Sequence, residues 1–122
     1  MTNRPDIWLG HASLSTNDLS ASGKFFRDIG LRFIFESDSI AIFELRGGTH
    51  LILSEEPVRA GNEADFDFMV EDIDTTYVEF TKLGYSMTGL EKGEIHDWFL
   101  ITEPGGNTIK VNSTHVADHG LV

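Results

Sequence analysis

Hydrophobic and polar residues alternate along this chain with two different periods. Four segments of its first half alternate every second residue, which is typical of strands, whereas Leu19, Phe25 and Phe26 recur at helical spacing. Asp18, or its neighbour Asn17, can cap the start of that helix, and a glycine follows its end. The expected elements are a strand at residues 7–15, a helix at residues 19–29, and strands at residues 31–36, 39–45 and 49–54.

The second half of the chain repeats this order of strand, helix and three strands. The expected elements are strands at residues 65–70, 85–90, 95–102 and 107–113, and a helix at residues 73–83. The two helix caps, Asp18 and Asp72, are 54 residues apart, and so are the glycines that end the helices. The diglycine turns at residues 47–48 and 105–106 are 58 residues apart, which predicts a four-residue insertion around residues 89–93. A duplicated unit implies two similar sheets.

These elements predict an α+β fold in a single domain that spans residues 1–122. Its two strand-helix-three-strand modules are expected at residues 7–54 and 64–113, joined by a linker at residues 55–63 and followed by a tail at residues 114–122. A right-handed crossover lays each helix on one face of its sheet and leaves the other face free.

Side-chain alternation divides the strand residues between these two faces. The helix-facing set is apolar and predicts the core: Ala12, Leu14, Ala41, Phe43, Leu45, Leu51, Leu53, Phe66, Phe68, Val70, Phe99, Ile101, Ile109 and Val111. The opposite set mixes polar and apolar side chains: His11, Ser13, His50, Ile52, Asp65, Asp67, Met69, His96, Trp98, Leu100, Thr108, Lys110 and Asn112. Such a mixture fits either the lining of a ligand cleft or a half-exposed antiparallel sheet.

Composition and charge exclude several classes of function. The chain has no cysteine, so thiolate metal sites, cysteine nucleophiles and disulfides are absent. Its formal net charge of -11 argues against a nucleic-acid partner. No apolar run is long enough to cross a membrane and the N-terminus has no apolar signal segment, so we expect a cytoplasmic protein.

Four short segments carry a family pattern: residues 10–19 (GHASLSTNDL), 25–31 (FFRDIGL), 66–74 (FDFMVEDID) and 103–109 (EPGGNTI). Together with the duplicated unit, they resemble the vicinal oxygen chelate superfamily, which includes glyoxalases, bleomycin-resistance and fosfomycin-resistance proteins, and extradiol dioxygenases. The resemblance covers nearly the whole chain. It implies that the paired modules form a concave, mostly antiparallel sheet cleft, and that the protein is a homodimer.

Metal-binding members of that family hold their ion with residues from the first and last strands of each module. The resemblance places these four positions at His11, Ile52, Asp65 and Lys110. His11 matches and Asp65 can ligate, whereas Ile52 cannot, although His50 lies on the same face. Lys110 is the main departure, because an ammonium has no lone pair to donate and repels a divalent cation.

Two arrangements of these residues remain open. In one, His11 and His50 join a carboxylate, Asp65 or its neighbour Asp67, in a displaced site for Fe(II), Mn(II), Ni(II) or Zn(II). In the other, Lys110 takes the place of the cation and pairs with Asp65 in a metal-free cleft. We favour the second, because a buried lysine needs a carboxylate partner and this face supplies two.

The favoured hypothesis is a small-molecule-binding protein of the glyoxalase and bleomycin-resistance type, without a cofactor, that holds a small organic ligand in the cleft. The alternative is a metal-dependent lyase, isomerase or dioxygenase that acts on a vicinal-oxygen substrate, with Asp67 as the candidate catalytic residue that moves a proton. Whether the protein is an enzyme stays open. The candidate ligand-binding residues are His11, Ser13, His50, Asp65, Asp67, Trp98, Lys110 and Asn112, and the candidate metal ligands are His11, His50 and Asp65.

Overall fold

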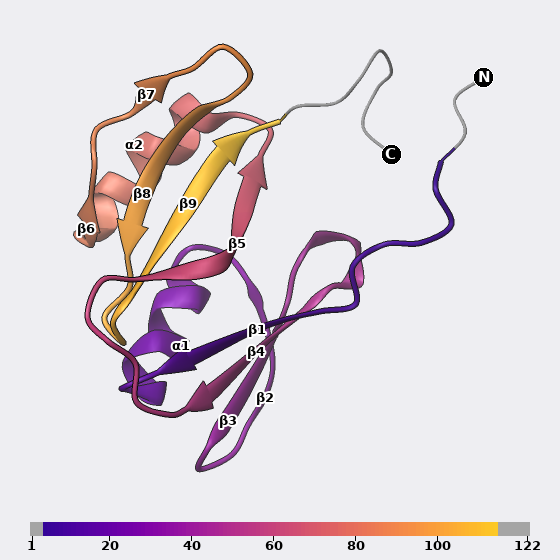
Figure 1. Ribbon diagram of the computed structural model, residues 1–122, viewed down its shortest axis with the longest axis vertical. Coiled ribbons are helices and arrows are strands. Elements are labelled where there is room, and N and C mark those ends of the chain that lie inside the picture. Colours follow the sequence, from indigo (N-terminus) through magenta and orange to yellow (C-terminus); the bar gives the residue numbers. More distant parts are fainter. Residues whose placement is uncertain (1–3, 115–122) are drawn as a thin grey trace.

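Two mixed sheets, each with one helix on one face, make up the computed structural model, which describes residues 4–114 (Figure 1). The first module contains β1 (His11–Thr16), α1 (Leu19–Asp28), β2 (Arg32–Glu36), β3 (Ile40–Glu44), the short 3-10 turn η1 (Arg46–Gly48) and β4 (His50–Glu55). The second contains β5 (Asn62–Val70), α2 (Ile73–Leu83), β6 (Ser86–Met87), β7 (Glu91–Lys92), β8 (Asp97–Thr102) and β9 (Asn107–Ser113).

The two sheets have the same topology. The first has the strand order β1-β4-β3-β2, with β1 parallel to β4, and the second has the order β5-β9-β8-β6, with β5 parallel to β9. The other pairings are antiparallel, and β7 pairs with β8 in the segment where the sequence predicts an insertion. The expected α+β fold of two strand-helix-three-strand modules is therefore confirmed.

Both predicted helix caps are present. The Asp18 carboxylate accepts a hydrogen bond from the amide of Ala21 at 3.0 Å, and Asp72 accepts one from Thr75 at the same distance. Gly84 ends α2 in the left-handed conformation at φ +85°, which a side chain would disfavour. The duplicated caps therefore define both helices in the same way.

Every residue of the predicted core is either buried or packed against the buried cluster. Phe25 and Phe26 of α1 are fully buried, and the Phe26 ring lies 6.3 Å from the ring of Phe68 on β5. Each fully buried phenylalanine contributes roughly 1.5–3 kcal/mol. Because this contact crosses from one module to the other, the two modules share one core.

Five predicted strands are shorter than expected, among them those that begin at residues 7, 85 and 95. β1 begins at His11, which is paired with the first residue of β4, so residues 7–10 lie before the paired part of the sheet. Ile7, Trp8 and Leu9 are consequently 87%, 69% and 61% exposed. The strand expected at 85–90 ends at Met87, and β8 begins at Asp97 instead of at residue 95.

A buried carboxylate joins the two modules. Glu103, between β8 and β9, is 1% exposed and accepts a 2.6 Å hydrogen bond from the hydroxyl of Ser22 on α1. It also accepts bonds from the amides of Gly105 and Asn107 and from the Asn107 side chain. Ser22 in turn contacts the Thr16 hydroxyl at 2.6 Å. These polar groups are all satisfied inside the protein, as burial requires.

The linker is held beside this network. The Asn17 side chain donates to the Val58 carbonyl at 2.7 Å and accepts from the Val58 amide at 2.8 Å. Within residues 4–114, no helix is long and apolar enough to span a membrane. Residues 115–122 of the expected tail lie outside the described part of the chain.

The close approach at Gly105 gives a stability prediction. A Cβ at this position would collide with the hydroxyl oxygens of Thr16 and Ser22. We expect Gly105→Ala to lower the free energy of unfolding by about 2–4 kcal/mol, because it overpacks the site and disturbs buried hydrogen bonds. Urea denaturation followed by circular dichroism measures this loss.

Gly89→Ala is the matched control, because a Cβ there would meet no atom within 4 Å. We expect it to change stability by less than about 0.5 kcal/mol. Equal stabilities of the two variants would contradict the proposed role of the Glu103 network.

Candidate functional site

On the free face of the second sheet, two neighbouring rows of side chains each run across three strands. Strands β5, β9 and β8 lie side by side, so residues in register across them are neighbours on the face. The first row is Asp67, Lys110 and Leu100, and the second is Met69, Asn112 and Trp98. Four residues that the sequence predicted for a ligand cleft therefore lie next to each other.

A pocket of about 620 Å³ lies on this face. Its lining combines three carboxylates and one ammonium with aromatic and aliphatic side chains, as ligand pockets commonly do. The lining residues are Leu9, Glu63, Ala64, Asp65, Phe66, Asp67, Trp98, Leu100, Thr108 and Lys110. The structure thus brings Asp65, Asp67, Trp98 and Lys110 together.

The ammonium of Lys110 lies over the ring of Trp98, with its nitrogen 4.6 Å from the ring centroid. This is the geometry of a cation–π interaction. The predicted Lys110–Asp65 ion pair is wrong, because within residues 4–114 Lys110 makes no ion pair. The pairing of β5 with β9 is irregular between Glu63 and Asp67, so Asp67 rather than Asp65 lies opposite Lys110.

Three polar groups around the lysine have no partner in the described part of the chain. The carboxylates of Asp65 and Asp67 are exposed to the pocket and make no hydrogen bond or ion pair there. Asn112 is only 4% exposed, and its Oδ1 atom is buried without a hydrogen-bond partner among residues 4–114. An unsatisfied buried carbonyl oxygen is costly, and functional sites are a common place for one.

The remaining predicted site residues lie on the free face of the first sheet. His11 is directly opposite His50, with ring centroids 6.1 Å apart, and His50 is opposite Glu44. The imidazole Nε2 of His50 lies 3.2 Å from a Glu44 carboxylate oxygen, and Arg32 donates a hydrogen bond to the same carboxylate. A polar row therefore crosses the first sheet, and none of its residues lines the pocket of the second.

The Arg32 guanidinium holds the pKa of the Glu44 carboxyl below its ordinary value, and the hydrogen bond with His50 lowers this pKa further. Glu44 thus stays ionised at neutral pH. An ionised carboxylate hydrogen-bonded to an imidazole fixes the orientation of the ring.

Within residues 4–114, no three His, Asp or Glu side chains are arranged to hold a metal ion. His11 and His50 belong to the first sheet, whereas Asp65 belongs to β5 of the second. The displaced metal site therefore stays a prediction, as does the catalytic role of Asp67.

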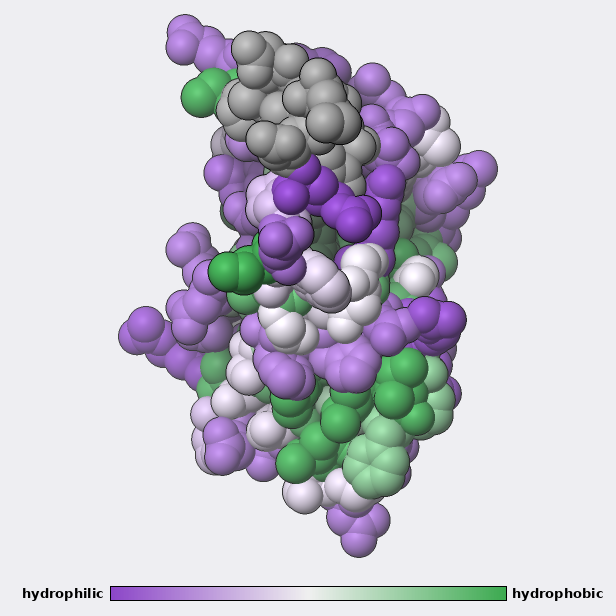
Figure 2. Space-filling view, turned by 90° about the vertical axis from the view of Figure 1, so that its right-hand side faces the viewer, coloured by the Kyte–Doolittle hydropathy of each residue, from purple (hydrophilic) through white to green (hydrophobic). Residues whose placement is uncertain are grey.

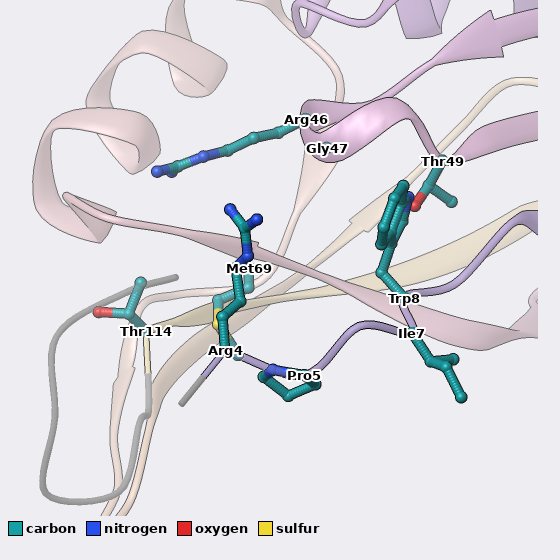
Figure 3. Close-up of a pocket in the computed structure, with 9 residues that line it drawn as sticks. All are labelled: Arg4, Pro5, Ile7, Trp8, Arg46, Gly47, Thr49, Met69 and Thr114. Atoms are coloured by element: carbon teal, nitrogen blue, oxygen red, sulfur yellow. The ribbon is translucent and has the colours of Figure 1, made fainter. Parts of the chain in front are cut away.

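A second pocket, of about 510 Å³, lies where the N-terminal segment passes the turn before β4 (Figure 3). Figure 3 shows the Trp8 indole beside Thr49 and the side chains of Arg4 and Arg46 on the other side of the pocket. Arg46 is already paired with Glu71 at 3.1 Å. Trp8 belongs to an exposed segment outside the sheets. Most residues of this pocket therefore come from that segment and from a turn, whereas most residues of the other pocket lie in paired strands.

Several residues of both sites escaped the sequence prediction. Leu9 was expected within a strand, and Glu63 was expected in the linker, yet both line the pocket of the second sheet. Glu44 and Arg32 complete the polar row of the first sheet. Alternation along β3 placed Glu44 on the free face, but only strand register showed its neighbours.

The family model for the Glyoxalase/Bleomycin resistance protein/Dioxygenase superfamily matches residues 8–111. The chain belongs to this superfamily. The predicted resemblance to the vicinal oxygen chelate proteins is thus confirmed. A comparison with curated proteins found no match.

Solved structures share the fold of this superfamily member at low sequence identity. A lactoylglutathione lyase from Agrobacterium tumefaciens is 19% identical, with a TM-score of 0.75 over 90% of this chain and 96% of its own. A bleomycin-binding protein in complex with bleomycin is 14% identical, with a TM-score of 0.70 over 89% and 99%. An antibiotic-binding protein from a Streptomyces species is 15% identical, with a TM-score of 0.70 over 91% and 98%. These likenesses show the fold alone.

The polar row gives a prediction about pH. We expect Arg32→Gln to raise the pKa of Glu44 toward its ordinary value of 4.5, because its strongest hydrogen-bond donor is lost. Carboxyl carbon shifts measured by NMR against pH report this titration. The native ion pair stabilises the fold above the ordinary pKa, and this stabilisation is lost as pH falls through the depressed pKa of Glu44.

Arg59→Gln removes an equal charge from a loop and should leave the Glu44 titration unchanged. If Glu44 titrates at the same pH in Arg32→Gln as in the parent protein, the assigned cause of the shift is wrong.

Proposed function

We propose that this protein binds a small organic molecule in the pocket on the free face of its second sheet, without the usual metal of the superfamily. One observation carries the proposal. Lys110 stands where metal-binding relatives place a carboxylate, and its ammonium lies in the pocket over Trp98. An ammonium in that place opposes a divalent cation, whereas an indole face and nearby carboxylates suit an organic ligand.

The shared fold is compatible with this proposal. Two of the proteins compared above are described as binding bleomycin or an antibiotic. The same fold occurs in binding proteins and in enzymes. The residues of the site, and not the fold, therefore distinguish the two functions.

A metal-dependent lyase, isomerase or dioxygenase is the second candidate. The observation that favours it is the contact of His11 with His50, whose rings are 6.1 Å apart on the first sheet. Two imidazoles at neighbouring strand positions can share a metal ion if a carboxylate approaches them. In such an enzyme Asp67 would be the group that moves a proton.

We expect flat aromatic fragments to bind the pocket and to shift the amide NMR signals of β8 and β9. Trp98→Leu should weaken the binding of those fragments at least tenfold, about 1.4 kcal/mol, because the stacking surface is lost. Trp8→Leu is the matched control, since Trp8 lines the other pocket, and it should leave the affinity unchanged. Shifts that centre on Thr49 and Arg46 would place the site elsewhere.

Metal analysis separates the two candidates. Protein purified without chelator should contain far less than one equivalent of Mn, Fe, Co, Ni or Zn, and these ions should not raise its melting temperature. One bound metal per chain that disappears in His11→Ala would overturn the metal-free proposal in favour of the enzyme.

We also propose that a second copy of the chain covers the free face of the first sheet. Ile34, Phe35 and Ile40 are 45%, 50% and 36% exposed, and Phe35 is in register with Ile42 and Ile52. Figure 2 shows apolar side chains gathered over the lower half of one side of the molecule. An exposed apolar patch of this kind marks an interface in many proteins.

Analytical ultracentrifugation tests the homodimer. The parent protein should sediment as a dimer at micromolar concentration, and Phe35→Ser should shift it toward the monomer by removing apolar contact area. Val78→Ser changes an exposed apolar residue on α2 and should leave the dimer intact. A monomeric parent protein would refute the proposed interface.

A further inference from the structure

Lys110 places a positive charge against the indole face of Trp98, at 4.6 Å from the ring centroid. Its side chain is exposed, and its opposite neighbour on β5 is Asp67. Nevertheless the ammonium makes no ion pair within residues 4–114. It contacts the aromatic face of Trp98 and not a carboxylate. The ring face is therefore a position that accepts a cation.

Groups that favour a cation surround this position. Glu63, Asp65 and Asp67 all line the pocket, and none of their carboxylates makes a hydrogen bond or ion pair in the described part of the chain. Three carboxylates against one ammonium leave the lining with a formal charge of -2. The whole chain, at -11, adds to the negative potential.

Asn112 is a buried polar neighbour of the Trp98 ring. It lies directly opposite Trp98 in the β8–β9 pairing, so the two side chains are neighbours on the face. Asn112 is 4% exposed, and its Oδ1 has no hydrogen-bond partner among residues 4–114. This oxygen is next to Trp98 but does not line the pocket.

We propose that the pocket recognises a flat organic cation and that Lys110 occupies the cation position until the ligand displaces it. This inference deepens the proposed binding function and rests on it. The exposed lysine moves away at low cost, because its flexible chain lets the ammonium return to water. A flat cation gains both the electrostatic attraction of the ring and the apolar contact of stacking.

The opposite arrangement would use Lys110 to anchor an anionic ligand. Such a ligand would lie close to three unpaired carboxylates in the same pocket, and like charges at close range repel. The charges of the lining therefore favour a cation, and an anionic probe makes the alternative testable.

The experiment compares three flat probes of similar size by isothermal titration calorimetry at about pH 8, where quinoline is neutral. The probes are the cation 1-methylquinolinium, neutral quinoline and the anion 2-naphthoate. Lys110→Met keeps the length of the side chain but removes its charge. We expect it to bind 1-methylquinolinium about five- to thirtyfold more tightly than the parent protein does, because the competing ammonium is gone.

Two control variants isolate the cause. Lys82→Met makes the same change of net charge on α2, away from the pocket, and should alter the affinity less than about twofold. Trp98→Leu combined with Lys110→Met should abolish the gain. Neutral quinoline has to displace the same ammonium, so Lys110→Met should tighten its binding as well, but less than it tightens that of 1-methylquinolinium, which also gains from the loss of a like charge.

Two different failures can be told apart. If the probes bind in a Trp98-dependent way but Lys110→Met does not tighten 1-methylquinolinium, or if the parent protein binds 2-naphthoate most tightly, the displacement of Lys110 is refuted while the binding function stands. If no probe binds to either protein in a way that depends on Trp98, the pocket is not a ligand site and the proposed function falls with the inference.

Discussion

The arrangement of the two modules depends on the hydrogen bonds that the buried Glu103 carboxylate accepts. A carboxylate removed from water is costly unless donors replace the water, and here they come from the Ser22 hydroxyl of α1, from Asn107 and from the amide of Gly105. The turn between β8 and β9 can reach these donors only because Gly105 has no side chain, since a Cβ would collide with Thr16. One end of the second sheet is thereby attached to the first module.

This attachment leaves both free faces available for contacts. The edge strands β1 and β5 are each paired on one side only, and residues of both strands line a shared pocket near the attached end. The free face of the first sheet carries a polar row beside an apolar patch, whereas that of the second holds the pocket with Trp98 and Lys110. The duplicated framework therefore presents two chemically different surfaces.

The pocket shows how strand register changes the chemistry of a motif. Lys110 occupies a position where the superfamily pattern predicts a metal ligand, and the irregular pairing of β5 sets Asp67 opposite it. The ammonium nevertheless lies on the indole of Trp98, its diagonal neighbour across β8 and β9. Within residues 4–114 the pocket carboxylates are thus left without partners, which is the physical basis for expecting a cationic ligand.

The sequence by itself determined the duplicated modules, a cap at the start of each helix, and a set of core residues that are all buried or packed against the buried cluster. These features depend on local hydrogen bonding and on the period of apolar residues, both of which can be read along the chain. Alternation also assigned the candidate site residues to the free faces. Only the tertiary structure decided that Asp67 lies opposite Lys110 and that the Lys110 ammonium lies over Trp98, since register and bulges depend on pairing between distant strands.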